Sequence, residues 1–189
     1  MGEFLREPGG SLYPAFEKRP EMEPVRPELE PEGPRVVGLF ISPGKGLPMM
    51  AQSSVNAVAG KGLEGDRYFY GTGAYSKAKP PKIRDVSIIS LEDIQAVNAE
   101  DGPEFTLEDT RRNIIVTGFK LNELVGKTIK LGQVIIQVTG LCEPCDRPSS
   151  LSKKSGFKSR FENRGGIRGQ IVNDGEIRVG SKFEIIPQE

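Results

Sequence analysis

Short apolar runs separated by turn residues dominate the chain from about residue 35 onward. Each run is rich in valine and isoleucine and is bounded by Gly, Pro or Asn, which is typical of β-strands. The pattern predicts strands at 35–41, 85–90, 113–117, 128–131, 134–138, 168–172 and 182–186. The segment 173–176 reads Asn-Asp-Gly-Glu and predicts a hairpin turn between two such runs, because Asp-Gly readily supplies positive φ.

Helical patterns are few and short. Ser90 followed by Asp93 predicts a helix over 91–98, with Ser90 as its N-cap. A short turn is expected over 106–109 and a second helix over 151–161. Many short strands, glycine turns and no regular alternation of strand and helix favour a mainly β fold, a barrel or a sandwich, over a doubly wound sheet.

The first 33 residues have a different composition. Proline and glutamate alternate over 21–32, and because proline removes backbone donors while charge opposes collapse, a packed core is not expected there. We therefore predict a flexible N-terminal tail over 1–33 and one domain over 34–189.

Charge and composition exclude several function classes. The 26 basic and 26 acidic residues balance, so no nucleic-acid partner is expected. The absence of histidine excludes a Ser-His-Asp triad, a Cys-His protease and a histidine-based zinc hydrolase. With no apolar run of membrane-spanning length and no signal-peptide pattern, we expect a cytoplasmic protein without a membrane partner.

The two cysteines, Cys142 and Cys145, follow the strongest strand candidate in a proline-stiffened loop. The sequence beyond them is basic, and nearby positive charge favours a reactive thiolate, whereas Glu143 and Asp146 oppose it. Two cysteines without histidine cannot complete a structural zinc site. A disulfide switch between the two stays open, as does simple packing of Cys142 as a small apolar residue.

Three further segments could bind an anion, and each has an ordinary structural alternative. Gly-rich 60–68 is either a ligand loop or a structured turn in which Asp66 pairs with Arg67. Arg111 and Arg112 could bind a phosphate or form ion pairs with neighbouring acidic residues. The segment 164–170 could form an anion nest or simply enter a strand.

Taken together and in this order, these segments resemble the MOSC domain, the C-terminal domain of molybdenum cofactor sulfurases. The resemblance rests on 62–67 (GLEGDR), 111–114 (RRNI), 121–126 (LNELVG), 142–145 (CEPC), 164–169 (RGGIRG) and 175–181 (GEIRVGS). Each motif is weak alone, but the ordered set is specific and spans about 35–187.

The resemblance implies a barrel-like β fold with a few short helices and assigns the chemistry to Cys145. Cys145 would either carry sulfur as a persulfide or ligate molybdenum in a pterin cofactor, as in relatives that reduce N-hydroxylated compounds. Because a pterin cofactor carries phosphate, the candidate cofactor-binding residues are Arg111, Arg112, Asn113, Arg164 and Arg168. Many relatives have histidine where Tyr68 stands here, so any role of that histidine is in doubt.

The resemblance also predicts partners. Sulfur transfer would need a cysteine desulfurase, which would hold the pyridoxal phosphate, and reduction would need an electron-transfer protein. Two alternatives need no cofactor: a thiol/disulfide redox switch that uses Cys142 and Cys145, with Cys142 resolving the Cys145 sulfur, and a non-catalytic module that binds an anion.

Overall fold

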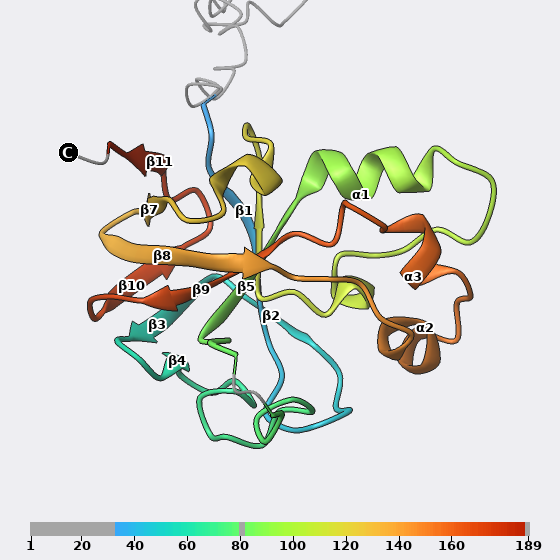
Figure 1. Cartoon of the computed structure of the whole chain (residues 1–189), viewed down its shortest axis with the longest axis horizontal. Coiled ribbons are helices and arrows are strands. Elements are labelled where there is room, and N and C mark those ends of the chain that lie inside the picture. The colour runs from blue at the N-terminus through green and yellow to red at the C-terminus, as the bar shows by residue number, and fades with distance from the viewer. Residues whose placement is uncertain (1–32, 80–81, 188–189) are drawn as a thin grey trace, which may run out of the picture. The chain divides into compact units, whose positions relative to one another are not determined.

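The computed structural model describes residues 33–79 and 82–187, so the predicted tail over 1–33 lies almost wholly outside the described residues. Its main feature is an eight-stranded curled sheet with the order β11-β7-β8-β9-β5-β6-β1-β2 (Figure 1). The strands are β1 (Val36–Ile41), β2 (Met50–Gln52), β5 (Val86–Ser90), β6 (Ile114–Val116), β7 (Thr128–Leu131), β8 (Val134–Leu141), β9 (Ile167–Ile171) and β11 (Phe183–Ile186). Strands β5 and β6 pair in parallel, whereas β8 pairs with both of its neighbours antiparallel. The prediction of a mainly β, barrel-like fold is confirmed.

The middle of the sheet is buried on both faces, because alternate side chains along β5 and β6 enter two different cores. In β6, Ile114 and Val116 pack inside the curled sheet, while Ile115 points to the other face. In β5, Ile88 and Ile89 divide in the same way. This two-sided burial explains why these strands read as continuous apolar runs in the sequence.

A smaller three-stranded sheet has the order β10-β3-β4. Its strands are β3 (Ser54–Val58), β4 (Gly62–Leu63) and β10 (Gly175–Arg178), none of which was predicted. The predicted hairpin is wrong, since β10 pairs with β3 and β9 pairs with β8 and β5. Asn173 and Asp174 bind other segments instead: their side chains accept the backbone N–H groups of Ile135 at 2.7 Å and Ala59 at 2.8 Å.

Helix α1 (Leu91–Asn98) has the predicted bounds and the predicted cap, in which Ser90 Oγ accepts the backbone N–H of Asp93 at 3.2 Å. The single helix expected over 151–161 is wrong. The chain forms α2 (Arg147–Ser152) and α3 (Phe157–Arg160), because Lys153 and Gly156 take positive φ values of 62° and 85° between them. Two short 3-10 helices, η1 (Glu108–Thr110) and η2 (Leu121–Leu124), complete the described elements.

The three α-helices gather on the side of the domain toward which β8 points (Figure 1). Helix α3 is anchored by Phe157 and Phe161, whose rings stack at 4.2 Å and meet Phe105 edge to face. Both rings are fully buried in the second core. The backbone N–H of Phe157 donates to Ser149 Oγ at 3.0 Å, so this aromatic cluster also fixes α2 and the cysteine loop directly before it.

Candidate functional site

Cys142 and Cys145 lie in the loop between β8 and α2. The backbone N–H of Cys142 donates to Gly166 O at 2.8 Å, which holds the start of this loop against the entry to β9. Gly165 lies so close that a Cβ on it would overlap the carbonyl oxygen of Cys142. Both thiols are half-buried, and neither forms a disulfide in the described part of the chain. The glycines at 165 and 166 therefore serve close backbone packing.

A pocket of about 230 Å³ opens beside these thiols. Among the described residues, its lining contains eight basic side chains and one carboxylate, Glu143. The basic residues are Lys45, Arg67, Lys82, Arg84, Arg111, Arg112, Arg147 and Arg168. Cys142, Cys145, Tyr68 and Tyr75 also line it. Such a concentration of cations around a concave site suits an anionic ligand.

Arg111 lies at the end of η1 in the left-handed region, with a φ of 61°. Its Nη1 donates to the carbonyl of Leu47 at 2.6 Å, but its buried Nη2 has no hydrogen-bond partner among the described residues. Burial first, and then the neighbouring Arg67 and Arg147, lower the pKa of Arg111 to about 10. The side chain stays cationic at neutral pH, in surroundings that an added anion would make more favourable.

Arg84 repeats this feature on another part of the pocket. Its buried Nη1 also lacks a hydrogen-bond partner in the described part of the chain. Its guanidinium lies 5.0 Å from the centre of the Tyr75 ring. Buried donors are rarely left unpaired in proteins, so these two guanidinium nitrogens are available to oxygen acceptors that enter the pocket.

Arg112 is buried and already occupied by backbone. It donates from Nε to Gly165 O at 2.8 Å, from Nη1 to Thr110 O at 3.1 Å and from Nη2 to Cys142 O at 3.0 Å. These contacts join η1, the cysteine loop and the entry to β9. Arg112 therefore holds the loop that carries the thiols.

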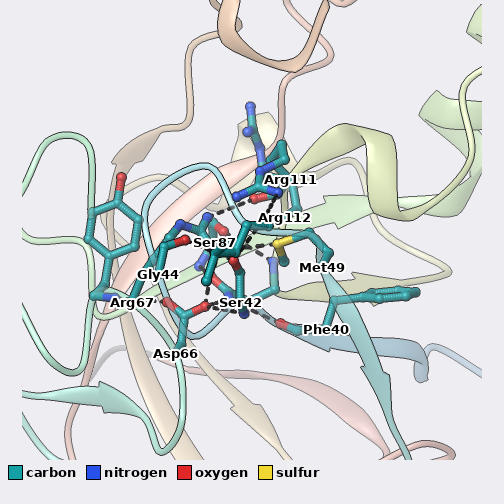
Figure 2. A network of polar contacts seen from close by, with 12 residues as sticks. Phe40, Ser42, Gly44, Met49, Asp66, Arg67, Ser87, Arg111 and Arg112 are labelled. Carbon is teal, nitrogen blue, oxygen red and sulfur yellow. Dashed lines mark hydrogen bonds and ion pairs between the residues drawn. The ribbon is translucent and has the colours of Figure 1, made fainter. Parts of the chain in front are cut away.

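Asn113 belongs to a buried polar network that also joins Ser42, Asp66 and Arg67, and Figure 2 labels these three partners. Its amide donates to Phe40 O and to Asp66 Oδ2, both at 3.1 Å. Asp66 Oδ2 also accepts the backbone N–H of Ser42 at 3.1 Å and Arg67 Nη1 at 3.0 Å. The structural alternative for 60–68, a turn in which Asp66 pairs with Arg67, is therefore what the structure shows. Arg67 also lines the pocket.

Comparison with known proteins places the chain in a family. Residues 77–184, more than half of the chain, match the MOSC domain. The chain belongs to the MOSC domain family. No curated protein sequence matches it.

Solved structures show the same MOSC fold at low sequence identity. The YuaD protein from Bacillus subtilis has a TM-score of 0.70 at 20% identity, over 82% of this chain and 97% of that one. YiiM from Geobacillus stearothermophilus has a TM-score of 0.62 at 11% identity, over 82% and 75% of the two chains. YiiM from Escherichia coli has a TM-score of 0.57 at 18% identity, over 82% and 71%.

Of the residues singled out by sequence, the MOSC domain brings Arg111, Arg112, Asn113 and Arg168 to the pocket that holds both cysteines. Arg168 donates from Nη1 to Leu141 O at 2.6 Å, at the end of β8. Arg164 does not line this pocket, and it pairs with Glu100 at 2.6 Å. The two arginines of the segment 164–170 face different neighbours because they lie on either side of the tight Gly165–Gly166 entry to β9.

Sequence reasoning missed several residues of this MOSC pocket, notably Arg67 as a lining residue, Tyr75 and Arg84. No motif marks Tyr75 or Arg84, and only folding brings their segment to the cysteine loop. Arg67 stands in the Gly-rich motif, where the sequence predicts for it only a structural pair with Asp66. Arg147 belongs to the basic segment that follows the cysteines, and the sequence alone gives it no separate role.

Within residues 33–79 and 82–187, no group of three or more His, Cys, Asp or Glu side chains is arranged to hold a metal ion. None of the helices in the same ranges has the length and apolar character needed to cross a membrane.

Proposed function

We propose that this MOSC domain is a molybdenum cofactor-linked protein that acts through the sulfur of Cys145. The observation that carries the proposal is the cationic pocket in which Cys145 lies together with Arg84 and Arg111, each of which has a guanidinium nitrogen without a partner among the described residues. A pterin cofactor supplies both a phosphate for the arginines and a metal that accepts a thiolate. The residues present therefore fit the group.

The polar residues of the pocket divide into two roles. Arg84, Arg111 and Arg168 would hold the phosphate, because planar guanidinium groups match its oxygens. Among the described residues, Arg84 and Arg111 each have one buried guanidinium nitrogen without a hydrogen-bond partner. Arg112 and Asn113, which sequence alone assigned to cofactor binding, keep the cysteine loop and the pocket wall in place through their backbone contacts. Arg164 lies outside the pocket lining, and its side chain pairs with Glu100 instead.

Cys145 supplies a soft sulfur ligand, which suits both molybdenum and sulfane sulfur. The bound molybdenum would provide the redox chemistry for reducing an N-hydroxylated compound, with an electron-transfer protein as partner. In the sulfur-carrier form of the proposal, the Cys145 thiolate would instead attack the outer sulfur of a cysteine persulfide on a pyridoxal-phosphate-dependent desulfurase. Cys145 would become the persulfide and the desulfurase cysteine would leave as a thiolate. The half-buried, disulfide-free state of Cys145 is compatible with both forms.

The test is to express the chain together with the molybdenum cofactor pathway and to measure molybdenum and pterin per chain. We expect close to one of each in the wild type, loss of molybdenum in Cys145→Ala and weaker retention of pterin in Arg111→Ala. Arg178→Ala is the matched control, because Arg178 lies on β10 with a side chain 70% exposed and pairs with Glu176. It should retain both molybdenum and pterin.

A second measurement separates the two forms. If the wild type holds no molybdenum, the purified chain is exposed to a cysteine desulfurase with cysteine, and mass spectrometry looks for an added sulfur on Cys145. Persulfide on Cys145 and none in Cys145→Ala supports the carrier form. Neither molybdenum nor persulfide in the wild type overturns the proposal and leaves the Cys142–Cys145 redox switch, which is tested through its dithiol reduction potential.

A further inference from the structure

The pocket beside Cys145 combines a sulfur nucleophile with walls that suit an anion. Eight of its described lining residues are Lys or Arg, and Glu143 is the one carboxylate among them. Arg84 and Arg111 each have a buried guanidinium nitrogen without a hydrogen-bond partner in the described part of the chain. An oxyanion in the pocket would give acceptors to both nitrogens, because every guanidinium group offers several N–H donors.

The Cys145 sulfur is held within the same pocket. Tyr75, which also lines it, donates its hydroxyl to Cys145 Sγ at 3.5 Å, across 70 residues of sequence. The guanidinium of Arg84 covers the Tyr75 ring at 5.0 Å, within the range of a cation–π contact. A short series of contacts therefore joins the thiol to one of the two arginines that have a donor to offer.

This combination suits an anion that itself carries a transferable sulfur. Thiosulfate is a small dianion whose sulfonate oxygens match guanidinium donors, and its outer sulfur can pass to a thiol. A cavity of about 230 Å³ admits an anion of that size. Sulfate and phosphate have the same kind of charge and oxygens, but they present no such sulfur to Cys145.

We propose that the chain has a second activity as a thiosulfate sulfurtransferase, in which Cys145 receives the outer sulfur. The Cys145 thiol attacks that sulfur, a new S–S bond forms, and the S–S bond of thiosulfate breaks with both of its electrons going to sulfite. The thiol proton leaves on the sulfite. One neutral thiol and one dianion thus become one persulfide anion and one hydrogensulfite anion, and no outside oxidant or reductant takes part.

Arg84 and Arg111 have a defined part in this transfer. They bind the sulfonate oxygens of thiosulfate and stabilise the negative charge that collects on the departing sulfite. The inference rests on the proposed function in taking Cys145 as the working sulfur. It names a small inorganic sulfur donor in addition to a desulfurase protein, and it can be tested without molybdenum or pterin.

The experiment is a thiocyanate assay on the full chain, purified from cells that make no molybdenum cofactor. Thiosulfate is the donor and cyanide is the acceptor, because cyanide takes the outer sulfur of a persulfide as thiocyanate and returns the cysteine thiolate. We expect thiocyanate above the protein-free rate with the wild type and none above it with Cys145→Ser. If that variant does not fold, tandem mass spectrometry of the wild type after thiosulfate alone should still find the added sulfur on Cys145.

A second set of measurements tests the anion site. Arg111→Met should raise the KM for thiosulfate about tenfold, because the variant loses charge-assisted hydrogen bonds to the substrate. Sulfate should inhibit the wild type competitively, and it should inhibit Arg111→Met about tenfold more weakly. Arg178→Ala is the matched control, since the Arg178 side chain is 70% exposed on β10, and this variant should keep the wild-type KM.

Several results would overturn the inference. They are a wild-type rate no higher than the protein-free rate, an undiminished rate in Cys145→Ser, and an added sulfur found on Cys142 alone. A KM for Arg111→Met within about twofold of the wild type also overturns it, because the pocket arginines then do not hold the substrate.

The two proposals fail separately. A chain that takes sulfur from a desulfurase or binds molybdenum, but takes none from thiosulfate, rejects the thiosulfate activity alone. Thiosulfate turnover by a chain that binds no molybdenum and takes no sulfur from a desulfurase supports this activity and rejects the cofactor-linked function.

Discussion

The adjacent residues Arg111 and Arg112 should respond to substitution in opposite ways. Arg112 is 7% exposed and donates to three carbonyls, while Arg111 has one carbonyl partner and a buried nitrogen without any among the described residues. We therefore predict that Arg112→Met lowers stability and that Arg111→Met chiefly lowers anion binding.

The size of the Arg112 effect follows from its contacts. Three hydrogen bonds from a charged donor, at about 1.5 kcal/mol each, give about 4.5 kcal/mol. Methionine fills part of the vacated volume and removes the cost of burying a charge, so the expected net loss is about 2 to 4 kcal/mol. A domain of ordinary stability, about 5–15 kcal/mol, would stay folded and measurable.

Urea unfolding gives the free energy of unfolding of each variant. The comparison holds if the dependence of that free energy on urea concentration is the same as in the wild type. For Arg111→Met we expect a change within about 1 kcal/mol, because the lost contact to Leu47 is offset by relief of the repulsion from Arg67 and Arg147. The reasoning is refuted if Arg112→Met costs less than about 1 kcal/mol, or if Arg111→Met costs as much as Arg112→Met.

Two further predictions concern the rest of the domain. Asp66→Ala should cost about 3 to 5 kcal/mol in urea unfolding, because it leaves the buried Arg67 without its ion partner. Glu64→Ala, an exposed change two residues away, should stay within about 0.5 kcal/mol, and equal effects of the two would contradict the argument. Burial raises the pKa of Glu92, but the backbone N–H groups of Glu92 and Gly118 and the Ser90 hydroxyl together lower it below 4.5. The melting temperature of the wild type should therefore exceed that of Glu92→Gln at about pH 7. This difference in melting temperature should disappear as the pH falls through the lowered pKa, and a difference independent of pH would contradict the argument.

Much of the fold could be read from the sequence. The strands of the large sheet that are buried on both faces appear as apolar runs, and the capping signal at Ser90 predicted the bounds of α1. Strand β3 was invisible because only two of its five residues are buried. The hairpin prediction was wrong for a related reason. Asp-Gly predicts a change of chain direction, but it does not say which strand β10 pairs with, and that partner is the distant β3.

For the candidate site too, one part followed from the sequence and another part only from the tertiary structure. The sequence by itself determined the MOSC motifs, the proline-stiffened cysteine loop and a supply of arginines, because these depend on residue identity and short-range order. Only the tertiary structure decided the role of each arginine. Arg112 donates to three carbonyls, Arg164 pairs with Glu100, and Arg111 has a nitrogen without a partner among the described residues, although the sequence alone treats all three as candidate anion-binding arginines. The Tyr75 contact to Cys145 joins residues 70 positions apart, and such a distance closes only when the whole sheet folds.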